Sequence, residues 1–297
     1  MDRNFIHIND GKNTHLRYIS SLFVILAFIF IIATIIYSSV IIVLSLFKPG
    51  LVNTDDFLIL DPLLDFYLYH IVNFIALLGM WLVARTILKR KLISFITPNA
   101  RINWSKIMFG FFISFLLFAL FAILDFAIFP NDYALNDFDG TRFALLVVAA
   151  IVLVPIQTTS EELLFRGFLL QWAGKFTKNP IILMMIVGGI FGGLHFGNPE
   201  MEHGAFWVAI DYLAMGFIWT YITIKTNSSE YAIGAHAANN MFLCIFLTMD
   251  DTVVGDIPSL FLVTNVNEML SAFTTITTGL IFLFVVLRKQ RNDYQFK

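Results

Sequence analysis

Charged residues are scarce in this 297-residue chain, and cysteine is almost absent. Asp, Glu, Lys and Arg together make up 13% of the residues, about half the share of roughly 25% that soluble domains carry. The net charge of −2 argues against nucleic acid as a partner, because proteins that bind it usually present a basic surface. The single cysteine, Cys244, excludes a disulfide framework and any zinc or iron–sulfur site built on several cysteines.

Hydrophobic residues, in contrast, make up 58% of the chain and occur in long runs. A helix needs about 20 apolar residues to cross the hydrocarbon core of a bilayer. Strands of a membrane barrel would instead show short alternating segments, and the sequence has none. The pattern predicts an all-α, polytopic membrane protein with about eight transmembrane helices. The runs lie at residues 17–47, 63–88, 107–129, 143–173, 181–196, 205–224, 232–249 and 268–287.

The basic residues fix an orientation for these helices. Short loops rich in Lys and Arg stay in the cytoplasm. Here they occupy the two tails and every second loop: Arg3, Lys12 and Arg17; Lys89, Arg90, Lys91, Arg101 and Lys106; Lys175 and Lys178; Lys225; and Arg288, Lys289, Arg291 and Lys297. The other loops are acidic, with only Lys48 and Arg142 as basic residues. We therefore expect a multi-pass membrane protein with both termini in the cytoplasm. The sequence has no recognisable organelle address and is one compact domain, which favours the bacterial cytoplasmic membrane. Residues 1–297 form one membrane domain, with a motif-bearing part at about 143–249.

Two glutamates and an arginine interrupt the fourth run. An ionisable group at membrane depth costs about 2.5–3.5 kcal/mol, so such groups are candidates for function. Glu162 and Arg166 are four residues apart and share a helix face, where they can neutralise each other. Glu161 points about 100° away and is available for another task. Pro155, just upstream, is expected to kink or break the helix. The alternative interpretation is a structural ion pair between helices.

Two histidines follow in later runs. His195 ends the fifth run, in which Gly188 and Gly192 are four apart, as are Gly189 and Gly193. Such pairs of small residues let helices approach closely. In the seventh run, His236 and Asn240 share one helix face. Taken alone, each of these histidines could equally be an interfacial or helix-packing residue.

Together these groups can activate water. A glutamate takes the proton and a histidine assists, while a second histidine and Asn240 can donate hydrogen bonds to an oxyanion. Alternatively, Glu161, His195 and His236 form a His₂Glu set that can hold a catalytic Zn²⁺. The helical H-E-x-x-H zinc signature is absent. The residues leave both alternatives open.

Three motifs in this order resemble those of the CAAX-protease and bacteriocin-processing family, also called the Abi family or type II CAAX prenyl endopeptidase superfamily. They are Glu161-Glu162-x-x-x-Arg166, Phe191-x-x-x-His195 and His236-x-x-x-Asn240. The resemblance implies an intramembrane endopeptidase in which Glu161 is the general base and His195 its partner. His236 and Asn240 would stabilise the oxyanion, and Glu162 and Arg166 would support the site. The family is commonly called metallo-dependent, and a metal-free glutamate mechanism has also been proposed for it.

The leading hypothesis is therefore hydrolysis of a membrane-associated protein or peptide, approached from the cytoplasmic side. The resemblance implies a role in bacteriocin immunity or peptide-signal processing. Two other functions compete with it, a non-catalytic immunity or scaffold protein and a proton-coupled transporter with a buried Glu/His relay. The sequence does not indicate an oligomeric state.

Overall fold

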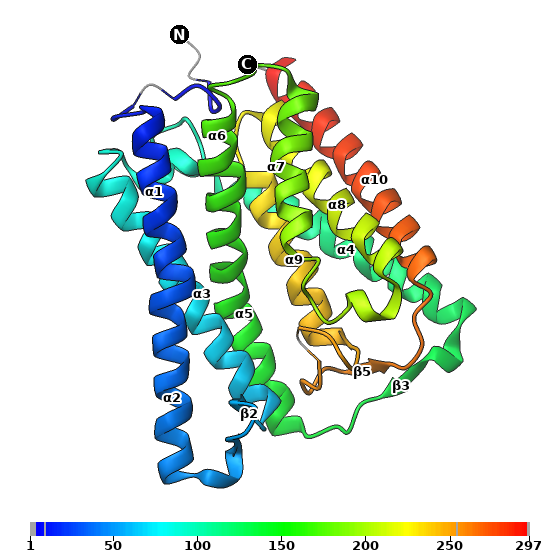
Figure 1. The fold of residues 1–297 in the computed structure, drawn as a ribbon. Coiled ribbons are helices and arrows are strands. Elements are labelled where there is room, and N and C mark those ends of the chain that lie inside the picture. Colours follow the sequence, from blue (N-terminus) through cyan, green and yellow to red (C-terminus); the bar gives the residue numbers. More distant parts are fainter. Residues whose placement is uncertain (1–3, 9, 254, 296–297) are drawn as a thin grey trace.

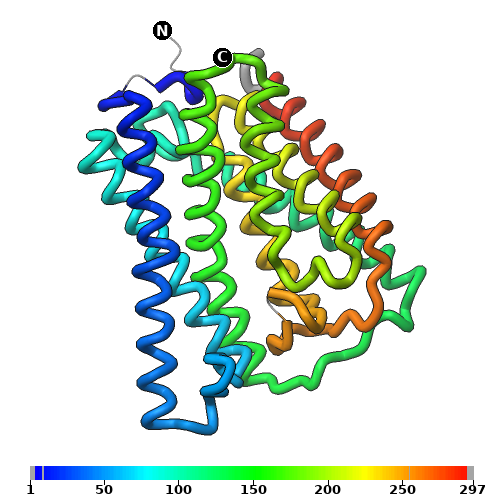
Figure 2. Tube along the Cα trace, in the orientation of Figure 1, coloured from blue at the N-terminus to red at the C-terminus, as the bar shows by residue number. Residues whose placement is uncertain are grey.

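The apolar runs fold into helical rods that pass up and down one bundle (Figures 1 and 2). The structure is a computed structural model that describes residues 4–8, 10–253 and 255–295. Within these residues the rods number eight: α1 (His15–Ala27), a π-helical segment (Phe28–Ile32) and α2 (Ala33–Phe47) in one rod; α3 (Pro62–Thr86); α4 (Trp104–Ile128); α5 (Gly140–Glu162), a π-helical segment (Leu163–Leu169) and α6 (Leu170–Ala173) in one rod; α7 (Pro180–Leu194); α8 (Met201–Thr226); α9 (Glu230–Phe246); and α10 (Glu268–Gln295).

Six of these rods are long and apolar enough to cross a membrane, so the prediction of eight crossing helices is confirmed in part. The α7 helix is apolar but has only 15 residues, and α9 has 17 residues. Most of α9 is buried by other helices and carries polar groups such as Glu230 and His236. Since α9 has little contact with the outside of the bundle, it does not need the apolar surface of a lipid-facing helix.

Large apolar side chains cover the outside of the bundle. Phe23 is 70% exposed, Phe47 80% and Leu116 63%. Large exposed apolar surfaces are unfavourable in water and are the normal outer surface of a helix in lipid. With six spans of this kind, the protein is a multi-pass integral membrane protein.

The chain directions agree with the predicted loop alternation. The start of α1 and the end of α10 lie at the same end of the bundle, drawn at the top of Figure 1. The connections from α3 to α4, α6 to α7 and α8 to α9 lie at that end too, because consecutive rods run in opposite directions. We call this the terminal end of the bundle and the opposite one the distal end.

The loops contain short strands and 3₁₀ turns, which were not predicted from the sequence. At the distal end, β1 (Val52–Asn53) pairs with β2 (Leu58–Ile59), and β5 (Phe261–Val263) lies between β3 (Tyr133–Leu135) and β4 (Leu247–Thr248). The β5 strand is antiparallel to β3 and parallel to β4. Strands of two or three residues are too short to show an alternating pattern. The 3₁₀ turns are Pro49–Leu51, Leu92–Phe95 and Pro130–Asp132.

The α5 helix is irregular at a different place from the one predicted. Pro155 lies inside α5, which continues through it to Glu162. The irregular part is the π-helical segment Leu163–Leu169, which begins directly after the two glutamates. Wide turns of this kind inside helices occur frequently at functional sites.

Two glycine contacts seat α9 deep in the bundle against α4. A Cβ atom added to Gly234 would lie 2.0 Å from the Ile107 carbonyl oxygen, and one added to Gly110 would lie 2.4 Å from the Tyr231 carbonyl oxygen. Only glycine permits backbones to approach so closely. The first turn of α9 is also internal, because the Ser229 amide donates to the Ile96 carbonyl at 2.8 Å. The α9 helix therefore starts inside the protein, below the terminal end of the bundle.

The predicted close approach of α7 also occurs, in one of its two registers. A Cβ atom on Gly188 would lie 2.6 Å from the backbone of Gly216 in α8, and one on Gly192 would lie 2.9 Å from Leu213. A Cβ atom on Gly189, in the other register, would lie 3.9 Å from the nearest atom, which belongs to the Phe217 ring. The α7 helix thus packs closely on α8 and carries His195 to the middle of the bundle.

Candidate active site

The predicted ion pair in α5 is present and completely buried. Arg166 Nη1 donates to Glu162 Oε1 at 2.9 Å, and both side chains have 0% exposure. Arg166 also donates to the Gly216 carbonyl at 3.4 Å, and its guanidinium lies 4.1 Å from the centre of the Phe191 ring. The pair therefore joins α5 to α8 and α7, as the structural interpretation of these residues required.

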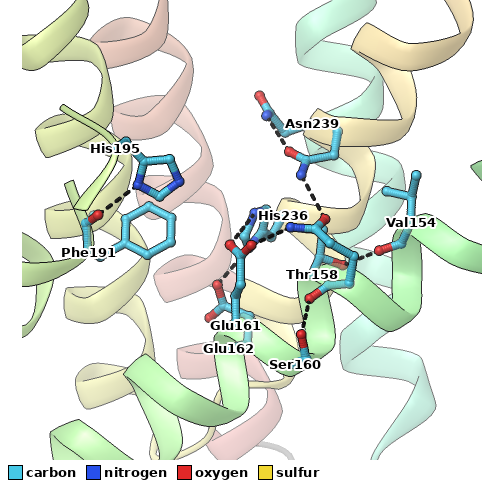
Figure 3. A network of polar contacts seen from close by, with 12 residues as sticks. Val154, Thr158, Ser160, Glu161, Glu162, Phe191, His195, His236 and Asn239 are labelled. Atoms are coloured by element: carbon cyan, nitrogen blue, oxygen red, sulfur yellow. Dashed lines mark hydrogen bonds and ion pairs between the residues drawn. The ribbon is translucent and has the colours of Figure 1, made fainter. Parts of the chain in front are cut away.

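The ion pair also holds a histidine. His236 Nδ1 lies 2.9 Å from Glu162 Oε1, and its Nε2 lies 3.7 Å from Glu161 Oε2 (Figure 3). Because Glu162 is paired with Arg166 and accepts at this oxygen, His236 Nδ1 is the donor. His236 is only 4% exposed, whereas the Glu161 side chain is 22% exposed. The two glutamates thus have different surroundings: Glu162 is completely buried, whereas Glu161 is accessible to solvent.

A chain of amides continues from Glu161. Gln157 Nε2 donates to Glu161 Oε1, and Asn240 Nδ2 donates to Gln157 Oε1 at 3.1 Å. Asn239 in turn donates to Asn240 Oδ1 at 2.9 Å (Figure 3). Gln157 is not among the site residues predicted from the sequence. Its spacing of four from Glu161 was the available signal, because residues at that spacing share a helix face.

His195 lies apart from this network. It caps the C-terminal end of α7, where its Nδ1 lies 2.7 Å from the Phe191 carbonyl oxygen. A carbonyl oxygen only accepts, so Nδ1 donates and Nε2 of the neutral ring is left as an acceptor. The ring stacks on Tyr212 with centroids 4.5 Å apart. The structure therefore pairs Glu161 with His236 rather than with His195, which the resemblance made the partner of Glu161.

Aromatic rings fix the orientation of both histidines. Trp219 stacks on His236 with centroids 4.5 Å apart, and Phe191 meets it edge-on at 5.9 Å. Phe191 also lies 4.7 Å from the His195 ring. These large side chains leave each imidazole little freedom to rotate.

All four predicted catalytic side chains face one cavity of about 790 Å³. The lining includes Glu161, His195, His236, Asn240 and also Gln157. This volume is within the range of about 300–1,000 Å³ that is usual for binding pockets. The cavity therefore brings His195 and Glu161 to the same space, although no direct contact joins them.

The predicted zinc ligands do not converge in this arrangement. In the described part of the chain, no group of three or more His, Cys, Asp or Glu side chains is spaced to hold a metal ion. His236 donates Nδ1–H to Glu162 and His195 donates Nδ1–H to the Phe191 carbonyl, so only Nε2 of each ring could bind a metal. Because the three side chains are not close enough together, Glu161, His195 and His236 do not fit a three-ligand zinc centre in this structure.

Comparisons with known proteins agree with the motifs. A family model described as type II CAAX prenyl endopeptidase Rce1-like matches residues 140–242, which contain every residue of the network. The uncharacterized protein YyaK of Bacillus subtilis (strain 168) is 48% identical over 296 residues, which cover 98% of this chain and 99% of that protein. No solved structure matches the chain. The chain therefore belongs to the Rce1-like type II CAAX prenyl endopeptidase family.

Proposed function

We propose that the protein is an intramembrane endopeptidase that hydrolyses a peptide bond with water activated by Glu161. One observation carries the proposal. Glu161 is an accessible carboxylate on the cavity: Gln157 Nε2 donates to its Oε1, and His236 Nε2 lies 3.7 Å from its Oε2. A sealed ion pair directly beneath it holds His236 in place. Family membership supports the same activity.

In the first step, Glu161 removes a proton from a water molecule in the cavity. The resulting hydroxide forms a bond to the carbonyl carbon of the substrate, and the electron pair of the C=O bond moves to the oxygen. General base catalysis of this kind contributes about 10²–10⁴-fold. The neutral His195 ring presents Nε2 as an acceptor, which can hold the attacking water or a substrate amide from the other side of the cavity.

In the second step, hydrogen-bond donors stabilise the oxyanion. The Asn240 amide carries two hydrogens, and one of them is used by Gln157. When the His236 ring is protonated, Nε2–H also donates toward the cavity, while Nδ1–H stays on Glu162. One donor of this kind is worth about 2.7–4 kcal/mol in the transition state.

In the last step, the tetrahedral intermediate collapses. The C–N bond breaks, and the Glu161 carboxyl group returns its proton to the leaving nitrogen. The products are an amine and a carboxylic acid, which passes its remaining proton to the amine or to water, and Glu161 is ionised again for the next cycle. No covalent enzyme intermediate is required, because Glu161 activates a water molecule and not a side-chain nucleophile.

A comparison of protein termini in cells tests the proposal. Cells that carry the wild type, Glu161→Gln or Glu202→Gln are analysed for newly formed N-termini by mass spectrometry. Glu161→Gln keeps the size and hydrogen bonding of the side chain but removes the base. Glu202 is exposed and does not line the cavity, so its variant is the matched control.

We expect a set of termini that occurs with the wild type and Glu202→Gln and disappears with Glu161→Gln. Identical termini in all three would overturn the protease function and favour a scaffold or immunity protein. The role in bacteriocin immunity or peptide-signal processing is part of the same proposal, and the identity of the cleaved proteins tests it.

A further inference from the structure

The cavity of the site belongs to the distal end of the bundle. Its lining includes Asp132 after α4, Asn198 in the turn before α8, Thr252 after α9 and Asn265 before α10. These segments all connect helices at the end opposite the start of α1 (Figure 1). None of the residues in the loops of the terminal end, 87–103, 174–179 and 227–229, lines it.

The terminal end is closed by buried segments. Phe5 has 0% exposure, packs into the core of the bundle, and its amide donates to Asn227 Oδ1 at 2.7 Å. Phe95, in the 3₁₀ turn between α3 and α4, is also fully buried, and a Cβ atom added to Gly167 would lie 2.5 Å from its carbonyl oxygen. A peptide therefore has no room to reach Glu161 between these segments.

The charges of the loops identify which side of the membrane each end faces. Of the chain's Lys and Arg residues, only Lys48 and Arg142, which is in the first turn of α5, lie in or directly beside the distal loops. Because short basic loops remain in the cytoplasm, the closed terminal end is cytoplasmic. The open distal end then faces the extracytoplasmic side. This is the opposite of the cytoplasmic approach expected from the sequence.

Among the Asp, Glu, Lys and Arg residues that the structure describes, only acidic ones line the cavity. It is lined by Asp125, Asp132, Glu200, Asp211 and Glu268 in addition to Glu161, and no Lys or Arg is among its described lining residues. Two buried carboxylate oxygens in the lining, Glu200 Oε2 and Asp211 Oδ1, have no hydrogen-bond partner within the described structure. A buried carboxylate oxygen without a donor is costly and favours a ligand that supplies one.

We propose that the substrate enters from the extracytoplasmic side, and that the segment that binds in the cavity carries lysine or arginine. The ammonium or guanidinium groups of such a segment would supply donors to Asp211 and Glu200. This inference rests on the proposed function for its substrate, but neither of its tests requires cleavage.

Thiol labelling in intact cells tests the direction of access. Asn265→Cys places a thiol in an exposed position of the cavity lining, and Lys178→Cys places one in an exposed loop at the terminal end. The wild type, whose only cysteine is the buried Cys244, gives the background. A membrane-impermeant maleimide is added before or after the cells are permeabilised.

We expect Asn265→Cys to react in intact cells and Lys178→Cys to react only after permeabilisation. The reverse pattern would overturn extracytoplasmic entry. Labelling of both variants in intact cells would overturn the assigned orientation as well. Because labelling does not depend on catalysis, these outcomes are separate from a failure of the proposed protease activity.

Peptide binding tests whether the segment that binds in the cavity is positively charged. Fluorescent peptides that differ only in carrying several lysines or several glutamates are titrated against purified Glu161→Gln protein. We expect the lysine peptide to bind about tenfold more tightly, and the preference to shrink with added salt. Adding Asp132→Asn and Glu268→Gln should reduce the preference, whereas adding Glu202→Gln, outside the cavity, should not. Equal binding, or tighter binding of the glutamate peptide, would overturn the cationic substrate.

Discussion

Arg166→Met should destabilise the protein far more than a typical loss of a salt bridge. Arg166 and Glu162 are both 0% exposed, with 2.9 Å between Nη1 and Oε1. Methionine is similar in length and fills most of the volume. The substitution therefore removes the charge and its hydrogen bonds, and it leaves Glu162 buried next to His236 with no cation of fixed charge.

The magnitude follows from the distance and the burial. At 2.9 Å and an effective dielectric constant of about 20, two unit charges attract by about 6 kcal/mol. Burial of both ions offsets part of this attraction, and the measured cost of removing one partner of a buried pair is about 3–5 kcal/mol. For a chain of this size such a loss lowers Tm by about 6–10 °C.

The chain contains a matched control for burial. Arg142 and Asp61 also approach to 2.9 Å, but their side chains are 39% and 26% exposed. Exposed pairs contribute about 0.2–1 kcal/mol, so Arg142→Met should lower Tm by at most a few degrees. Both variants are measured by thermal unfolding of purified protein in detergent. A second variant, Glu162→Gln with Arg166→Met, should recover much of the loss because it removes the isolated charge.

Equal Tm values for Arg166→Met and Arg142→Met would refute the reasoning. They would show that Glu162 is not held as an ion by Arg166, and the anchoring of His236 would need another explanation.

Three further predictions concern helix ends, helix packing and metal. The Arg142 guanidinium holds the pKa of Asp61 below its usual range, so this pair stabilises the protein above pH about 4, and the stabilisation is lost as pH falls through the lowered pKa. The Asp61→Asn variant keeps the helix cap, and the difference in Tm between it and the wild type should shrink as pH falls over that range. A constant difference in Tm would contradict this. Gly216→Ala should cost about 1–3 kcal/mol because its Cβ would lie 2.3 Å from the Gly188 carbonyl oxygen, whereas Gly189→Ala should be tolerated; equal thermal stability of both would contradict the close approach of α7 and α8. Because the predicted zinc ligands do not converge, we expect cleavage by purified protein to survive removal of metal by a chelator, and loss of activity that zinc restores would contradict this.

Much of the fold could be predicted because the features that determine it, apolar runs and loop charges, can be recognised along the sequence alone. Long apolar runs and alternating loop charges specified the rods and their directions without any knowledge of packing. The short strands gave no signal, and α9 was drawn as an ordinary span. Its burial depends on Gly110 and Gly234, whose contact with the opposite helix is visible only in three dimensions.

The sequence identified side chains that line one cavity but not how they pair. Spacing within one helix identified Glu162 with Arg166, because that contact is local. The predicted run at 232–249 has His236 near its start, which would lie at the membrane surface if the helix began there. The first turn of α9 is instead buried beneath the loop that contains Ile96, and this brings His236 level with both glutamates.

The central claim is that Glu161 activates the water that cleaves the substrate. The most direct measurement is the single-turnover cleavage rate of a peptide by purified wild type and Glu161→Gln, after matched thermal unfolding has shown that both are folded. We expect the rate to fall by about 10²–10⁴-fold in the variant, because the general base is lost. A rate within a few-fold of the wild type would contradict it.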